Sequence, residues 1–111
     1  MTEPVDTARS MVMTTCGTPE EADHIAAALV EWKLAACVQK VRISSTYMWE
    51  GRVHHDDEVL LLIKSSTDRV PAVSDTIRSL HSYDLPEIIE VPITGGDPDY
   101  LEWIGRMTHP D

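Results

Sequence analysis

The fold of this 111-residue chain is decided by residues 34–66, LAACVQKVRISSTYMWEGRVHHDDEVLLLIKSS. In the first half apolar side chains such as Val41 and Tyr47 recur on one face, which is the period of two of a β-strand. The second half ends in DEVLLLIKS, which is apolar on both faces, as expected of a buried strand. The stretch therefore predicts two long strands that turn back on each other at Glu50-Gly51.

The length of this predicted hairpin has a consequence for assembly. Each arm runs to about a dozen residues, against the ~5–6 of a usual globular strand. A single small domain covers only part of such a ribbon, and the tip carries the aromatic residues Tyr47 and Trp49. We therefore expect the projecting part to pair with another subunit.

The rest of the chain alternates strand and helix signals. Residues 11–16 are β-rich, and Thr18-Pro19-Glu20-Glu21 has the form of a capping box that opens a helix. Thr67 or Asp68 is expected to cap a second helix, residues 87–93 to form a strand, and Asp97-Pro98 to open a short last helix. The expected buried stripes of the three helices are Ala22, Ile25, Ala26, Leu29 and Trp32; Val70, Val73, Ile77 and Leu80; and Tyr100, Leu101, Ile104 and Met107.

This order of elements predicts the fold class. It is the βαββαβ order of a ferredoxin-like α+β domain, in which two helices cover one face of a four-stranded antiparallel sheet, with a short C-terminal helix added. Pro92 places the last strand at an edge or at its exit from the sheet. We expect residues 1–10 to form a flexible arm and residues 11–111 a single domain.

Composition narrows the classes of function. The net charge of −10 disfavours nucleic acid and anionic membranes as partners. There is neither a long apolar run nor the pattern of a signal peptide, so we expect a cytoplasmic location, with Cys16 and Cys37 as reduced thiols. No serine elbow, HExxH, phosphate loop or CxxC is present, so neither an enzyme nor an organic cofactor is predicted.

The predicted topology gathers one set of chemically active residues. Cys16, the Trp49–His55 turn and the His81–Glu87 loop are expected at one end of the domain. Cys16 is either core packing or, with its pKa lowered by the following helix N-terminus, a metal ligand. His81 is either a cap on the second helix or a second ligand.

Six phrases in order and spacing resemble one known family: MTTCGTPEEA, EWKLAACV, STYMWEG, DEVLLLIKS, HSYDLPEII and DPDYLEWI. Over about Met11 to Ile104 the chain resembles the CutA (CutA1) family of divalent-cation tolerance proteins. The resemblance implies a non-enzymatic homotrimer of ferredoxin-like subunits, akin to PII signalling proteins. It also implies binding of copper or other divalent metal ions.

The resemblance places the metal ligands on Cys16 and His81. Leu80 stands where some members have a second histidine, so a third donor is expected from water, Asp84, Glu87 or a neighbouring subunit.

Two other functions stay open at the level of sequence. A PII-like sensor would bind a small metabolite in inter-subunit clefts, and an assembly protein would present only a surface. The residues expected to line such a cleft are Trp49, Glu58, Lys64, Tyr83 and Glu87.

Overall fold

The structure, a computed structural model, describes residues 8–109. Most of the arm predicted over residues 1–10 therefore lies outside the described residues. The elements follow in the order β1 (Arg9–Cys16), α1 (Pro19–Glu31), β2 (Cys37–Trp49), β3 (Arg52–Ser66), a short 3-10 turn (Thr67–Arg69), α2 (Val70–Leu80), β4 (Ile89–Ile93) and α3 (Pro98–Thr108).

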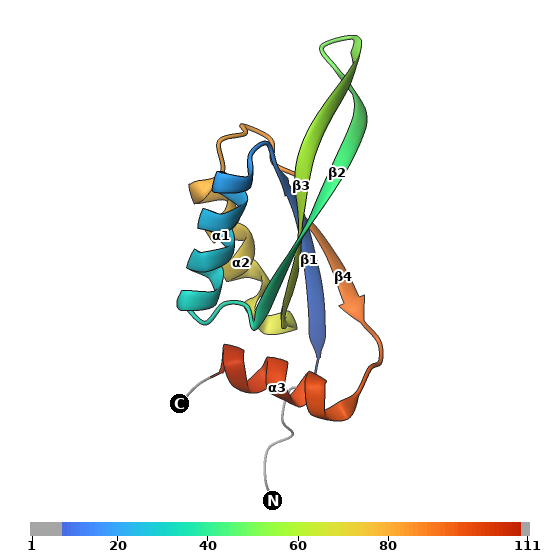
Figure 1. Ribbon diagram of the computed structural model, residues 1–111. Helices are drawn as coiled ribbons and strands as arrows, with labels where there is room; N and C mark the ends of the chain where they lie inside the picture. The colour runs from blue at the N-terminus through green and yellow to red at the C-terminus, as the bar shows by residue number, and fades with distance from the viewer. Residues whose placement is uncertain (1–7, 110–111) are drawn as a thin grey trace, which may run out of the picture.

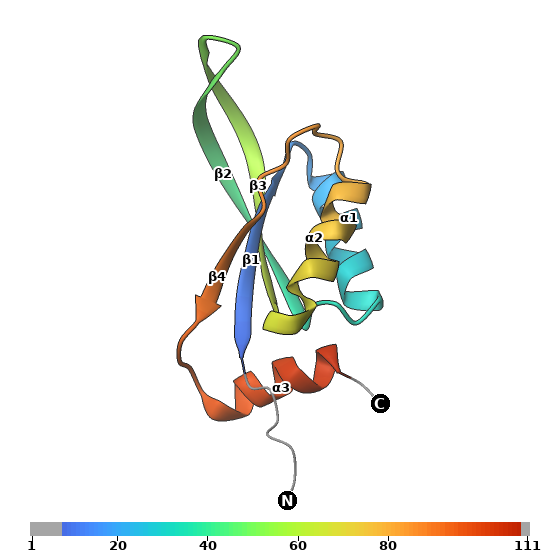
Figure 2. The same cartoon turned by 180° about the vertical axis from the view of Figure 1, so that it is seen from behind.

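The four strands form one antiparallel sheet in the order β2-β3-β1-β4. Helices α1 and α2 lie side by side on one face of it, as both views show (Figures 1 and 2). The predicted ferredoxin-like α+β fold is confirmed. Pro92 lies in β4, which is an edge strand, as the missing N–H of proline requires.

The predicted hairpin turn is also confirmed. Only Glu50 and Gly51 separate β2 from β3, and both have a positive φ, 51° and 75°. Two successive residues with positive φ match the right-handed twist of the flanking strands, as in a type I′ turn. From this turn the two strands stay paired back to Cys37 opposite Lys64.

Strand β1 is much shorter than the strand it pairs with. It accompanies β3 only from Ser66 to Val59, which lies opposite Cys16. The part of β3 from Arg52 to Glu58 therefore pairs with β2 alone and projects beyond the helices (Figure 1). We call this ribbon, residues 43–58, the overhang. It contributes to the elongated shape of the molecule, which measures 58 × 25 × 20 Å.

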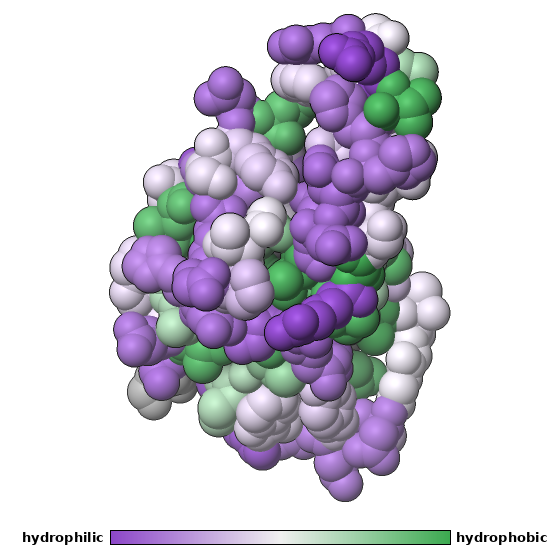
Figure 3. Space-filling model, turned by 45° about the horizontal axis from the view of Figure 1, so that its top comes forward, coloured by the Kyte–Doolittle hydropathy of each residue, from purple (hydrophilic) through white to green (hydrophobic). Residues whose placement is uncertain are grey.

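The overhang exposes apolar side chains. Tyr47, Met48, Trp49 and Val53 are all exposed, Met48 at 64%. Figure 3 shows hydrophobic groups standing among hydrophilic ones on this projecting part. Single exposed apolar residues are common on protein surfaces, but these four lie together on one ribbon, as at sites that bind a ligand or another protein.

The core lies between the helices and the sheet. Its fully buried side chains come from β1, β3, α1 and α2: Val12, Ile25, Leu29, Leu61, Ile63, Val73 and Ile77. Helix α3 closes the end of the sheet opposite the overhang (Figure 2). It is held by Arg9 Nε, which donates to the Leu101 carbonyl at 2.8 Å, and by a 2.7 Å bond between the Ser66 and Thr108 hydroxyls.

Three side chains expected in the buried stripes are exposed instead. Trp32 is 58% exposed because α1 ends at Glu31, so that Trp32 is the C-cap. Tyr100 and Met107 are exposed because α3 crosses only the end of the sheet and fully buries Ile104 and Thr108 alone.

Several boundaries also differ from the prediction. Strand β1 begins at Arg9, so Arg9 and Ser10, expected in the arm, are buried in the sheet. Strand β4 begins at Ile89, two residues later than expected, and α2 begins at Val70, after a 3-10 turn, with no side-chain cap.

Burial on α1 gives a direct test of this core. Replacement of the fully buried Leu29 by alanine should reduce the free energy of unfolding by about 2–5 kcal/mol, because it removes apolar contacts and leaves a cavity. The matched control Val30→Ala removes an exposed side chain from the same helix and should change the free energy by less than about 0.5 kcal/mol. Urea denaturation measures both; equal effects would contradict the packing described.

Candidate functional site

Three elements bring a thiol, a carboxylate and an imidazole together where β1 ends. Cys16 is the last residue of β1, Glu21 lies in the first turn of α1, and His81 is the C-cap of α2. One potential ligand atom from each lies within 4.8 Å of the others. We call these residues the Cys-Glu-His group.

The imidazole of His81 is fully buried and fixed on both nitrogens. Nε2 lies 2.7 Å from the Thr15 carbonyl oxygen and 4.0 Å from Cys16 Sγ, while Nδ1 accepts from the Tyr83 backbone N–H at 3.0 Å. A carbonyl only accepts and an amide N–H only donates, so the ring is neutral with its proton on Nε2. A metal ion at Nε2 would replace this proton and its bond to Thr15.

Glu21 was expected to close the capping box, and half of that motif forms. The Thr18 hydroxyl accepts from the Glu21 N–H at 3.2 Å, but the carboxylate turns to the segment after α2. Its Oε2 accepts from the Ser82 N–H at 3.0 Å, and its buried Oε1 lies 3.6 Å from His81 Nδ1. By hydrogen-bond geometry Oε1 has no partner among residues 8–109, so one carboxylate oxygen is left available.

The thiol of Cys16 is not activated as the sequence suggested. Burial raises its pKa to about 12, and the negative charges of Glu21 and Glu58 act in the same direction. The helix N-terminus was expected to lower the pKa, but desolvation and two carboxylates outweigh it. At neutral pH the thiol is therefore protonated.

The structure thus brings together the two predicted ligands and adds a third donor that sequence reasoning missed. Asp84 and Glu87, considered as the third donor, lie outside the Cys-Glu-His group. The sequence did place Glu21 in the first turn of the helix that follows the strand ending at Cys16. The direction of its carboxylate depends on a hydrogen bond from the Ser82 N–H, 61 residues away, which the sequence does not reveal.

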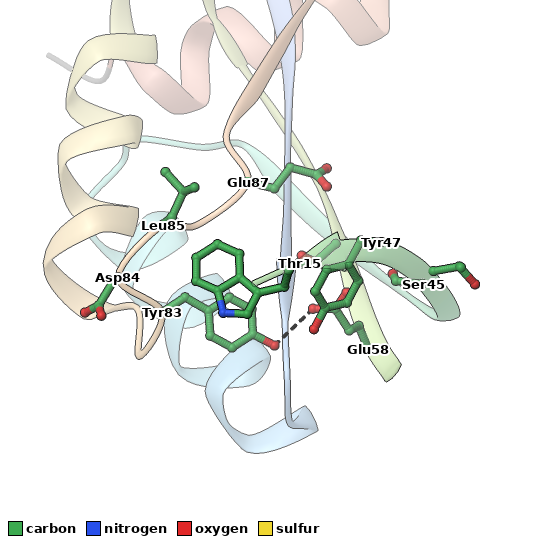
Figure 4. A pocket seen from close by; sticks show the side chains of 10 residues that line it. Thr15, Ser45, Tyr47, Glu58, Tyr83, Asp84, Leu85 and Glu87 are labelled. Atoms are coloured by element: carbon green, nitrogen blue, oxygen red, sulfur yellow. Dashed lines mark hydrogen bonds between the residues drawn. The ribbon is translucent and has the colours of Figure 1, made fainter. Parts of the chain in front are cut away.

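A cavity of about 620 Å³ opens beside this group, between the overhang and the loop after α2. It lies within one chain, and its lining includes Trp49, Glu58, Tyr83 and Glu87, four of the five residues expected at a cleft between subunits. Figure 4 shows the Tyr83 hydroxyl directed at Glu58, to which it donates at 3.0 Å. Burial and this hydrogen bond raise the pKa of Tyr83 to about 12.

Lys64, the fifth residue expected at a cleft between subunits, does not line this cavity of the single chain. It pairs with Met11 near the start of β1, whereas the cavity lies beyond the strand's end at Cys16. Its ammonium group lies 3.4 Å from the Tyr100 hydroxyl of α3 instead.

The four-stranded antiparallel sheet with two helices on one face defines a ferredoxin-like α+β protein (Figure 1). The model of the family described as CutA1 divalent ion tolerance protein matches residues 10–107. The chain belongs to this family.

Curated relatives agree over most of the chain. It is 42% identical over 99 residues to the divalent-cation tolerance protein CutA of Thermus thermophilus, with 88% of this chain and 96% of that one covered. It is 41% identical over 100 residues to protein CutA of Mus musculus, with 89% and 56% covered. The chain therefore spans little more than half the length of the mouse relative.

Solved structures share the whole fold. CutA1 from Oryza sativa superposes with a TM-score of 0.90 at 38% identity, covering 94% of this chain and 96% of that one. The CutA protein from Archaeoglobus fulgidus, described as periplasmic, gives 0.89 at 34% identity, covering 91% and 99%. Among the described residues, no helix of this chain is long and apolar enough to cross a membrane.

The raised thiol pKa predicts an alkaline loss of stability. Between pH 9.0 and about 12 the folded state keeps the Cys16 proton that the unfolded chain loses, so the folded state binds more protons. The stabilisation is complete below this window, and the free energy of unfolding should fall as pH rises through it.

Urea denaturation at about pH 8 and about pH 10.5 measures this contribution. Wild type should lose more stability between the two values than Cys16→Ser, which lacks the thiol but keeps every other titrating group. Equal losses in the two proteins would show that Cys16 titrates normally.

Proposed function

We propose that this protein serves divalent-cation tolerance by binding a soft metal ion, with copper preferred, through Cys16, Glu21 and His81. The observation that carries the proposal is the convergence of a thiol, an imidazole and a carboxylate within 4.8 Å. The names of the relatives support divalent-cation tolerance as the biological role.

The donor set suits such an ion. Thiolate and imidazole are ligands of copper and zinc, and the Irving–Williams order favours copper at a given site. The buried Glu21 oxygen without a hydrogen-bond partner fits a third ligand position. Bound metal would also satisfy Oε1 of this carboxylate, whose Oε2 already accepts from the Ser82 N–H.

We further propose that the working unit is a homotrimer and that its role is binding rather than catalysis. The exposed apolar side chains of the overhang support self-association. If the overhang of each subunit contacts a different surface on the next subunit, the contacts must close into a ring or they continue into a fibre. A trimer is such a closed ring. The two free cysteines, Cys16 and Cys37, support a reducing compartment, and we propose the cytoplasm.

The metal proposal is tested by calorimetric titration with zinc and, anaerobically, with cuprous ion. Cys16→Ser and His81→Ala should each lower the affinity at least about tenfold, because loss of even a second-shell partner costs that much. Glu21→Gln keeps the acceptor for the Ser82 N–H and should also weaken binding. Cys37→Ser is the matched control, since Cys37 pairs near the other end of the sheet, opposite Lys64.

Affinity should also rise with pH. Because the Cys16 pKa is raised to about 12, binding releases the thiol proton throughout the neutral range. The apparent affinity of wild type should increase by up to about tenfold per unit between about pH 6 and pH 8. Unchanged affinity in the Cys16 and His81 variants, or no dependence on pH, would make these residues structural.

The trimer is tested by light scattering at micromolar concentration, which should give about three times the monomer mass of 12.4 kDa. With a net charge of −10 per chain, added salt should leave the assembly intact or strengthen it, since salt screens self-repulsion. A monomeric mass contradicts the proposal, and dissociation at high salt would show that ion pairs hold the subunits together.

A further inference from the structure

The cavity beside the Cys-Glu-His group is lined mainly by aromatic and acidic side chains. Among its ten described residues, three are aromatic and three are carboxylates, and none is lysine or arginine: Tyr47, Trp49, Tyr83, Glu58, Asp84 and Glu87. The aromatics come from both walls, the overhang and the loop after α2 (Figure 4).

Aromatic faces and carboxylates attract the same kind of ligand. The quadrupole of an aromatic ring binds cations, and cages of such rings recognise ammonium groups. The nearby carboxylates add a Coulomb attraction, which the absence of a basic side chain from the lining leaves uncompensated. We propose that this cavity binds a small organic cation, an amine or a quaternary ammonium compound.

Two of the rings are held in place before any ligand arrives. Tyr83 donates to Glu58 at 3.0 Å, and its ring centroid lies 4.7 Å from that of His81. The Tyr47 hydroxyl donates to Asp56, and its ring stacks on His54 at 5.5 Å. Fixed side chains lose little entropy when a ligand binds, so the site is preorganised.

The size and charge distribution favour an organic cation over a metal ion. Among residues 8–109, the cluster of three potential ligand atoms close enough for one metal is the Cys-Glu-His group, which contains none of the cavity's carboxylates. Carboxylates spread around about 620 Å³ suit a charge distributed over a larger molecule. The inference is therefore independent of the proposed metal site.

Matched probes test the charge requirement. Choline, putrescine and spermidine are titrated into the assembled wild-type protein, followed by calorimetry and tryptophan fluorescence. At least one should bind with a dissociation constant below about 1 mM, and added salt should weaken it. The neutral isostere of choline, 3,3-dimethyl-1-butanol, should bind at least about tenfold more weakly than choline, because it lacks the charge.

Matched variants locate the binding. Trp49→Leu should weaken the best probe by about 2- to 30-fold, the range of a cation–π contact. Glu87→Gln should weaken it by about fivefold, the effect of losing one charge attraction at about 4 Å in water. The controls Trp32→Leu and Glu102→Gln make the same changes at exposed positions outside the cavity and should leave probe affinity unchanged. Zinc affinity should be the same in all four variants, which separates this site from the metal site.

Three results would overturn the inference. The first is no binding of any of the three cations up to about 10 mM, as expected if a second copy of the chain fills the cavity. The second is equal affinity for choline and its neutral isostere. The third is equal probe affinity in the cavity variants and their controls.

Discussion

The structure depends on a mismatch in strand length. Strand β3 has 15 residues and β1 has eight, so β1 ends at Cys16 opposite Val59 while β3 continues for seven residues more. At that point the chain leaves the sheet, turns at Gly17 and enters α1. The mismatch leaves the overhang without support, and it places the end of β1 next to the N-terminus of α1 and the loop after α2. The donor group and the cavity both form at this junction.

The junction is electrostatically unusual because it collects carboxylates around a buried thiol. Glu21 from α1 and Glu58 from β3 both raise the pKa of Cys16, and Glu58 also accepts from Tyr83 in the neighbouring cavity. A site of this kind holds a proton strongly in the absence of cations and attracts positive charge. Cation binding is therefore the chemistry that we propose for this junction, with a metal ion at the Cys-Glu-His group and a larger cation in the cavity beside it.

Local patterns in the sequence predicted the frame of the molecule. The alternation in residues 34–66 and the pair Glu50-Gly51 specify the hairpin, because strand period and turn chemistry are local properties. These local patterns did not specify contacts between segments that are far apart in the sequence. The turning of Glu21 to Ser82, the separation of Lys64 from the cavity and the exposure of Trp32 each depend on where elements end and meet. Of the two interpretations of Cys16, the one with a lowered thiol pKa was wrong, because only the local helix N-terminus was visible in the sequence.

We propose one metal ion at the point where Cys16, Glu21 and His81 converge. Anomalous diffraction from crystals grown with copper or zinc, recorded on both sides of the metal absorption edge, tests it most directly. We expect an anomalous peak adjacent to Cys16 Sγ and His81, present in wild type and absent from Cys16→Ser. A peak instead on the histidine and aspartate side chains of the overhang, at His54, His55 or Asp56, or no ordered peak at all, would contradict it.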